Sequence, residues 1–127
     1  MIPRQNFNVL CVDDNIAILE LLGAAFLRAG YDVEMAKNAF VALQKVNKNP
    51  QRFQLIVTDI RMPGLDGFGL IEQARATGYP GAFVVYAAMI SPDDRQRLRE
   101  LRVHRVLSKP TLSSELIAAA KDVQTGF

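Results

Sequence analysis

Four charged side chains stand directly after three short apolar runs that lie far apart in the sequence. The side chains are Asp13, Asp14, Asp59 and Lys109, and the runs that precede them are 7–12, 55–58 and 105–108. If the runs are parallel strands, their carboxyl ends share one edge of the sheet, where ligands bind in sheets of this kind. We therefore expect the four side chains to converge on one site.

Three carboxylates in one place raise one another's pKa, and a bound divalent cation relieves that repulsion. Hard oxygen ligands favour Mg²⁺ or Mn²⁺, and an ion held by two carboxylates keeps positions open for water or phosphate oxygens. One carboxylate can then attack phosphorus and form an aspartyl phosphate, while the metal and Lys109 neutralise the transferring phosphoryl group. Taken singly, these acids have structural alternatives, since Asp14 or Asn15 can cap a following helix.

Two hydrophobic periods alternate along the chain and predict the elements that position these residues. Short apolar or alternating runs, which are typical of strands, lie at 7–12, 31–35, 55–58, 82–86 and 105–108. Helical stripes lie between and after them, starting near Ile16, Ala39, Phe68, Pro92 and Leu112. Because parallel strands need crossovers of one hand, this alternation predicts an α/β fold: a doubly wound parallel sheet with helices on both faces, or three-layer sandwich.

The fourth predicted helix has the clearest local start signal. Ser91 stands where a cap is expected, Pro92 fits the first helical position, and Asp94 completes the spacing of a capping box. Gly30 is the corresponding stop signal after the first helix.

Length and composition narrow the function classes. With 127 residues, half of them hydrophobic, the chain suits a single domain, for which we expect residues 1–127 with a core of about 6–124. The net charge is only +2, so charge gives no reason to expect direct binding of nucleic acid. We find no apolar run long enough for a membrane and no signal-peptide core, so we expect no membrane contact and a cytoplasmic location. The single cysteine, Cys11, excludes an internal disulfide.

The segment after the third predicted strand resembles the receiver domain of response regulators, the CheY-like family of two-component signalling. It reads Asp59-Ile60-Arg61-Met62-Pro63-Gly64-Leu65-Asp66-Gly67, which is similar to the family's D-x-x-M-P-x-(M/L)-D-G. The pairs Asp13-Asp14 and Lys109-Pro110 match the family as well, and the resemblance covers essentially the whole chain. It implies a flavodoxin-like (βα)5 fold with strand order 2-1-3-4-5.

The resemblance also implies a role for each site residue. Asp59 would be the phospho-acceptor and also a metal ligand, Asp14 a direct Mg²⁺ ligand, and Asp13 a ligand through a water. The backbone carbonyl of Arg61 would be a further ligand. Lys109 would bind the phosphoryl group, and its peptide bond to the following proline would be cis. A histidine kinase or histidine phosphotransfer domain would supply the phosphoryl group, and the chain would catalyse only its own phosphorylation and autodephosphorylation.

Two positions depart from the family's pattern. Receivers usually carry Ser or Thr 22 residues before the lysine and Tyr or Phe three residues before it, where this chain has Ala87 and Val106. Without the hydroxyl, one charge-assisted hydrogen bond to the phosphoryl group is lost, which removes roughly 1.5–3 kcal/mol of the coupling between phosphorylation and the conformational change. Moving a two-state equilibrium from 1:99 to 99:1 needs about 5.5 kcal/mol. We therefore expect phosphorylation to remain chemically competent with a weakened readout. Tyr86 is expected on the opposite face of the strand.

Arginines recur along the fourth predicted helix. Arg95, Arg99 and Arg102 stand at i, i+4 and i+7 and are expected on one face, either as a solvated surface or as a docking surface for an acidic output partner. We expect a monomer or weak dimer.

Three other functions compete with the phosphate-accepting receiver. The first is a pseudo-receiver that works as an interaction or dimerisation module without phosphorylation, which Ala87 and Val106 favour. A phosphohydrolase with an aspartyl phosphate would need an acid where Arg61 stands. A nucleotide-binding P-loop would need G-x-x-x-x-G-K-[ST], which does not occur in the sequence.

Overall fold

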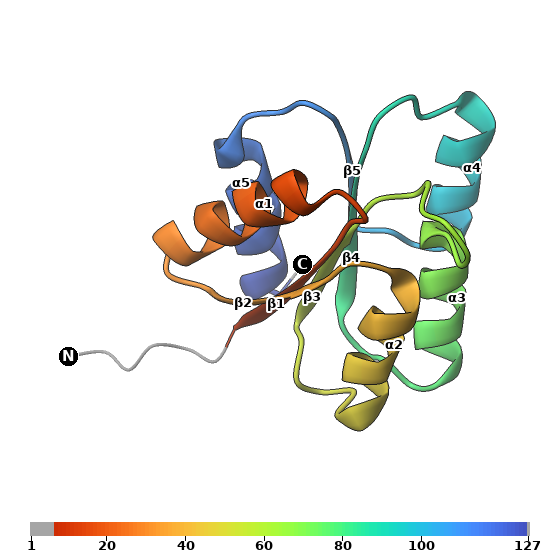
Figure 1. Cartoon of the computed structure of the whole chain (residues 1–127), viewed down its shortest axis with the longest axis horizontal. Helices are drawn as coiled ribbons and strands as arrows, with labels where there is room; N and C mark the ends of the chain where they lie inside the picture. Colours follow the sequence, from red (N-terminus) through yellow and green to blue (C-terminus); the bar gives the residue numbers. More distant parts are fainter. Residues whose placement is uncertain (1–6, 127) are drawn as a thin grey trace.

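A five-stranded parallel sheet lies between two layers of helices (Figure 1). The computed structural model describes residues 7–126. The strands are β1 (Asn8–Val12), β2 (Asp32–Ala36), β3 (Leu55–Thr58), β4 (Ala82–Ala87) and β5 (Arg105–Ser108). The helices are α1 (Ile16–Arg28), α2 (Ala39–Lys48), α3 (Gly67–Ala76), α4 (Pro92–Glu100) and α5 (Ser113–Gln124). The strand order β2-β1-β3-β4-β5 confirms the predicted flavodoxin-like (βα)5 topology.

Alternate residues of the strands fill two separate cores. Val9, Cys11 and Tyr86 are buried on the face that α1 and α5 cover. Leu10, Val12 and other buried residues pack on the opposite face, under α2, α3 and α4 (Figure 1). Burial on both faces explains why the central strands are continuous apolar runs in the sequence.

Two helix starts confirm local sequence signals. Asn15 caps α1, because its side chain accepts a hydrogen bond from the backbone N–H of Ile18 at 3.2 Å. The capping box of α4 is complete: the Asp94 N–H donates to Ser91 Oγ at 3.0 Å, and the Ser91 N–H donates to Asp94 Oδ2 at 3.1 Å.

The end of α4 corrects the expectation that three arginines share one helical face. The helix ends at Glu100, so Arg95 and Arg99 lie on it and Arg102 lies in the turn beyond it. Arg102 has a φ of +57°, and the backbone N–H of the residue after it donates to the carbonyl of Leu98 at 3.1 Å. This is the left-handed turn that commonly closes a helix, with an arginine where glycine is usual.

Two sequence expectations bear on the limits of the described structure. The expected start of the core at residue 6 lies outside the described residues. Within residues 7–126, none of the helices combines the length and apolarity that crossing a lipid bilayer requires.

Candidate functional site

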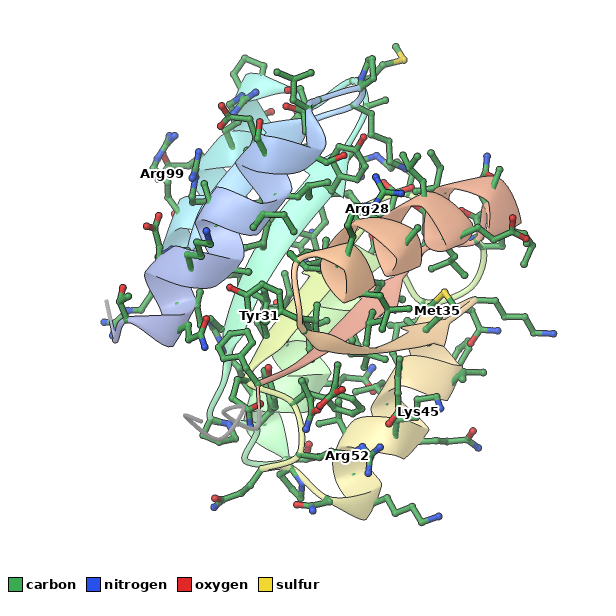
Figure 2. The ribbon with its side chains drawn as sticks, turned by 90° about the vertical axis from the view of Figure 1, so that its left-hand side faces the viewer. Arg28, Tyr31, Met35, Lys45, Arg52 and Arg99 are labelled. Atoms are coloured by element: carbon green, nitrogen blue, oxygen red, sulfur yellow. The ribbon has the colours of Figure 1, made fainter. Side chains whose placement is uncertain are left out.

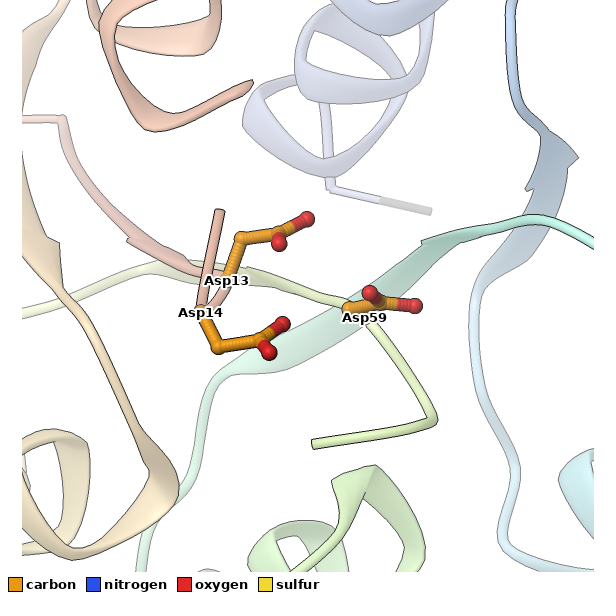
Figure 3. Close-up of side chains that lie close together, drawn as sticks. All are labelled: Asp13, Asp14 and Asp59. Carbon is orange, nitrogen blue, oxygen red and sulfur yellow. The ribbon is translucent and has the colours of Figure 1, made fainter. Parts of the chain in front are cut away.

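Asp13, Asp14 and Asp59 meet beyond the carboxyl ends of the neighbouring strands β1 and β3 (Figure 3). The backbone N–H of Asp59, just after β3, donates to the carbonyl of Val12 at 3.1 Å, which fixes the end of β3 beside the end of β1. One carboxylate oxygen from each of Asp13, Asp14 and Asp59 lies within 4.8 Å of the others. Asp13 is buried, Asp59 is half-buried and Asp14 is exposed, so the cluster opens toward solvent on one side.

Lys109 reaches the same cluster from the edge of the sheet. Its Nζ donates to Asp13 Oδ2 at 2.7 Å and to Asp59 Oδ2 at 3.0 Å. Its backbone N–H donates to the carbonyl of Ala87 at 2.8 Å, which ties the end of β5 to the end of β4. The peptide bond between Lys109 and Pro110 is cis, as the resemblance implied.

Burial and charge act in opposite directions on the titration of the site. Burial raises the pKa of Asp13, and the hydrogen bond from Lys109 only partly offsets this. Burial alone would lower the pKa of Lys109, but its hydrogen bonds to Asp13 and Asp59 outweigh burial and raise that pKa. The lysine therefore stays protonated beside acids that repel one another.

The two inner acids are oriented by backbone groups. Asp59 Oδ1 accepts a hydrogen bond from the N–H of Ile60 at 2.7 Å, and Asp13 Oδ1 accepts one from the N–H of Asn15 at 2.9 Å. Each of these carboxylates thus has one oxygen on a backbone donor and the other on Lys109. The orientation is set by the chain itself before any ligand binds.

This donor set fits a magnesium ion. Mg²⁺ prefers oxygen ligands at about 2.1 Å, so two ligands on opposite sides of the ion lie about 4.2 Å apart. The separations of at most 4.8 Å among the three acids need only a small closure to reach that geometry. Three clustered carboxylates with one lysine also leave negative charge that a divalent cation would neutralise.

Gly67 gives the loop after Asp59 its shape, and only its place in the motif marked this glycine in the sequence. A Cβ at Gly67 would lie 2.2 Å from the carbonyl oxygen of Asp59, so no other residue fits without moving that backbone. Its N–H donates to the carbonyl of Ile60 at 2.8 Å. Asp66 then caps α3, accepting from the N–H of Gly69 at 2.9 Å. The motif therefore folds α3 back against the strand end.

Sequence reasoning missed an ion pair beside the site. Arg61 Nη2 donates to Asp94 Oδ1 at 2.8 Å and to Asp94 Oδ2 at 2.7 Å. The hydrogen bonds of Ser91 and Arg61 lower the pKa of Asp94 against the opposing effect of its burial. The sequence signal for Asp94 was only its capping-box spacing, which says nothing about a partner 33 residues away.

The two atypical positions lie on the face of α2, α3 and α4. Ala87, fully buried, pairs with Ser108 at the end of β4 and β5, and Val106 pairs with Val85. Tyr86 faces the α1 and α5 side, as expected, and its ring centroid lies 5.6 Å from Lys109 Nζ. The side chain at position 87 therefore offers no hydroxyl to the site.

Comparisons with known proteins agree with this geometry. Residues 9–121 match the family model described as the response regulator receiver domain. The chemotaxis protein CheY4 of Vibrio cholerae has a similar structure, with a TM-score of 0.84 and 28% identity over 94% of this chain and 99% of that chain. The receiver domain of the Francisella response regulator 1452 has a TM-score of 0.86 and 27% identity, over 94% and 98% of the two chains.

Among curated relatives, the chain is similar to one domain of longer proteins. It is 34% identical to a CpxR homologue of Haemophilus influenzae, a transcriptional regulatory protein, over 91% of this chain and 49% of that protein. It is 32% identical to a gliding motility regulatory protein of Myxococcus xanthus, over 93% of this chain and 15% of that protein. The chain thus spans half or less of these relatives. It belongs to the response regulator receiver domain family of two-component systems.

Proposed function

We propose that this chain is a phosphate-accepting receiver, in which Asp59 takes a phosphoryl group from a histidine kinase or a histidine phosphotransfer domain. The observation that carries the proposal is the pair of hydrogen bonds by which Lys109 bridges Asp13 and Asp59, with an oxygen of Asp14 within 4.8 Å of the two acids. Mg²⁺ would be held by Asp13, Asp14, Asp59 and the backbone carbonyl of Arg61. Mn²⁺ would serve in the same position.

The chain's own residues account for the transfer step. A carboxylate oxygen of Asp59 attacks the phosphorus of a phosphohistidine, the O–P bond forms, and the P–N bond breaks with its electron pair left on the histidine nitrogen. Lys109 already contacts Asp59 at 3.0 Å and is placed to follow the charge onto the phosphoryl oxygens. The metal, when bound, neutralises the negative charge that would otherwise repel the incoming phosphoryl group.

Hydrolysis of the aspartyl phosphate ends the signal. Water attacks the aspartyl phosphate and regenerates Asp59 and inorganic phosphate. The chain is then not an enzyme acting on a metabolite, because it catalyses only its own phosphorylation and autodephosphorylation. Such a protein would work in the cytoplasm, where its kinase and ATP are found.

Phosphate incorporation tests this function. Incubation with a small phosphodonor and Mg²⁺ should add one acid-labile phosphate per chain, measured by intact-protein mass spectrometry. Asp59→Asn should abolish the phosphorylated product. Asp14→Asn should slow phosphate incorporation at least about tenfold, because it weakens Mg²⁺ binding. Asp93→Asn, an exposed acid in the first turn of α4, is the matched control and should leave the rate unchanged. Equal phosphorylation of the Asp59→Asn variant would overturn the assignment.

A pseudo-receiver that binds a partner without phosphorylation is the second candidate. The observation that favours it is the buried Ala87, which offers no hydroxyl where the conventional switch needs one. This candidate predicts that the protein ignores phosphodonors and that Asp59→Asn leaves partner binding unchanged. The mass spectrometry above therefore separates the two functions.

The exposed arginines on α4 are the proposed docking surface for an acidic output partner. Arg95 and Arg99 lie on the outer side of the helix, and Figure 2 shows Arg99 projecting at the edge of the molecule. Arg99→Glu should lower the affinity for the partner and make that affinity less sensitive to salt concentration. A solvated surface would show neither change. For the free chain we propose a monomer or weak dimer.

A further inference from the structure

A cavity of about 700 Å³ opens at the end of the sheet opposite the acidic cluster. Its walls come from segments that precede β1, β3, β4 and β5 and from the ends of α3 and α5. Five of its lining residues matter here: Arg75, Arg102, His104, Phe7 and Phe53. The volume is within the range of sites that hold small organic ligands, roughly 300–1,000 Å³.

Two arginines meet at this cavity without a carboxylate. Arg75, half-buried in the last turn of α3, donates from Nη2 to the backbone carbonyl of Arg102 at 3.1 Å. Among residues 7–126, no Asp or Glu lies within ion-pair distance of either guanidinium. Each guanidinium carries five N–H donors, and the structure assigns only one of those of Arg75 to a protein acceptor.

The surroundings of Arg75 show that its charge is poorly compensated. Burial lowers the pKa of Arg75, and the positive charge of Arg102 lowers it further. Its Cζ lies 5.3 Å from the ring centroid of Phe83, a contact that supports the guanidinium but does not neutralise it. An anion in the cavity would remove the repulsion between the two arginines.

Arg102 occupies a backbone position that disfavours it. It has a φ of +57° in the turn after α4, a conformation in which glycine is the usual residue. The chain nevertheless has an exposed arginine at this position, among the residues that line the cavity. The turn explains the backbone of Arg102, whereas the lack of a carboxylate partner for its guanidinium among the described residues leaves this cation available to a ligand.

His104 adds a further polar group. Its Nε2 is buried and has no hydrogen-bond partner among the described residues, although Asp122 Oδ2 lies 3.9 Å away. Because its Nε2 is buried beside Asp122, His104 belongs to the wall of the cavity, and the two arginines are the groups that can donate to a ligand.

We propose that this cavity, which we call the Arg75–Arg102 cavity, binds a small molecule that carries a phosphate group. The planar guanidinium fork matches the oxygens of phosphate and binds them through charge-assisted hydrogen bonds. The remaining volume, walled by Phe7 and Phe53, accommodates an organic portion. The site lies at the opposite end of the strands from Asp59, so its occupation does not depend on the proposed phosphorylation.

Titration of the isotopically labelled full chain tests the cavity. Inorganic phosphate and adenosine monophosphate are the two probes, added in the presence of EDTA so that no metal brings phosphate to the acidic cluster. Saturable NMR shifts at residues 75 and 102–104, with none at 13–14 or 59, are expected. Tighter binding of the nucleotide assigns the site to an organic phosphate, and equal binding assigns it to free phosphate. Absence of binding by both probes overturns the proposal.

Variants separate binding from folding. Arg102→Gly should raise the melting temperature, because it relieves the left-handed backbone, while it weakens probe affinity about tenfold or more through the lost charge-assisted hydrogen bond. Arg75→Gln should weaken affinity by a similar factor. Arg99→Gln removes the same charge from α4 outside the cavity and should change affinity by less than about twofold. Equal weakening by Arg99→Gln, or unchanged affinity in Arg102→Gly, contradicts a site at this place.

Discussion

Arg61 and Asp94 join the loop that follows β3 to the first turn of α4. One guanidinium nitrogen of Arg61 donates to both carboxylate oxygens of Asp94, at 2.8 Å and 2.7 Å. The Asp94 carboxylate also completes the capping box with Ser91, so a single acid holds the helix start and the loop together. The position of α4 therefore depends directly on a residue two places after Asp59.

Removal of this ion pair should loosen the start of α4. Arg61→Met should lower the free energy of unfolding by about 1 kcal/mol, since the guanidinium is largely exposed and the pair is screened by solvent. It should also speed amide hydrogen exchange in the first turns of α4. Arg95→Met, which removes the same charge from the exposed side of α4, is the control and should do neither. Unchanged exchange in Arg61→Met would show that the capping box alone holds the helix.

Substitution of Gly67 should damage both stability and phosphorylation. In Gly67→Ala the new Cβ would lie 2.2 Å from the Asp59 carbonyl oxygen, so the backbone just after β3 must move. We expect a loss of about 2 kcal/mol or more in urea denaturation and a slower rate of phosphate incorporation. Gly23→Ala is the comparison, because its Cβ would meet only the flexible Met35 side chain at 3.3 Å. That helical substitution should be neutral or stabilising by up to about 1 kcal/mol.

Spacing within one segment explains why much of this fold could be predicted. The strand runs and the Ser91–Asp94 capping box depend on residues only a few positions apart, so the sequence displays them directly. The acidic cluster was also predictable, because parallel topology brings the residues after β1 and β3 together whatever the loops do.

Two features could not be predicted for the opposite reason. The contact of Arg61 with Asp94 spans 33 residues and depends on the path of the loop and on one side-chain rotamer. Arg102 continues the helical spacing of Arg95 and Arg99, and no glycine signals that the helix has already ended. Periodicity therefore predicted a longer helix than the backbone forms.

The conventional readout of phosphorylation should be weak in this chain. Beryllofluoride with Mg²⁺, a phosphoryl mimic, should shift NMR signals near Asp59 and leave α4 and α5 largely unchanged, because Ala87 has no hydroxyl to bond the mimic. Ala87→Ser should extend the shifts toward α4 through a bond worth about 1.5–3 kcal/mol. Ala88→Ser, at the exposed neighbouring position, should not. Large wild-type shifts across α4 and α5 would contradict the expectation.

Lys109 should contribute more to stability when the metal is absent than when it is bound. In Lys109→Met the buried Asp13 loses its cation, and we expect a loss of about 2–3 kcal/mol in EDTA. Mg²⁺ should restore part of this loss and raise the melting temperature more than it does in the wild type. Lys121→Met, near the exposed end of α5, should respond to Mg²⁺ as the wild type does. The same Mg²⁺ increment in all three proteins would argue against a metal at the acidic cluster.

Stability should depend on pH through Glu34 on β2. Its carboxylate binds Lys45 Nζ at 3.1 Å and also pairs with Arg52, two cations that lie near each other in Figure 2. Burial opposes ionisation, but these two hydrogen bonds outweigh it and lower the pKa of Glu34. Because the pKa of Glu34 is lower in the folded state, its ionised carboxylate stabilises the protein at pH values above the ordinary glutamate pKa. This stabilisation is lost as the pH falls through the lowered pKa.

Glu34→Gln tests that dependence. The variant should be less stable than the wild type by up to about 1 kcal/mol near pH 7, with the difference shrinking as pH falls below about 4. Denaturant titrations at several pH values measure it. If the difference in stability between the two proteins grew as the pH fell, the burial of Glu34 would destabilise the protein by more than its ion pairs stabilise it.

Lys109 extends from the position just after β5, an edge strand, across β4, to the acids that follow β1 and β3. The contacts of Lys109 with Asp13 and Asp59 therefore depend on the register of β5 against β4. A slip of one residue would carry the ammonium about 3.3 Å, which is more than contacts of 2.7 Å and 3.0 Å can tolerate. The pairing of Ala87 with Ser108 thus determines where the Lys109 ammonium group lies relative to Asp59, two strands away. A partner that bound the open edge of β5 and shifted this pairing would change the contacts of Asp59 without touching an acid.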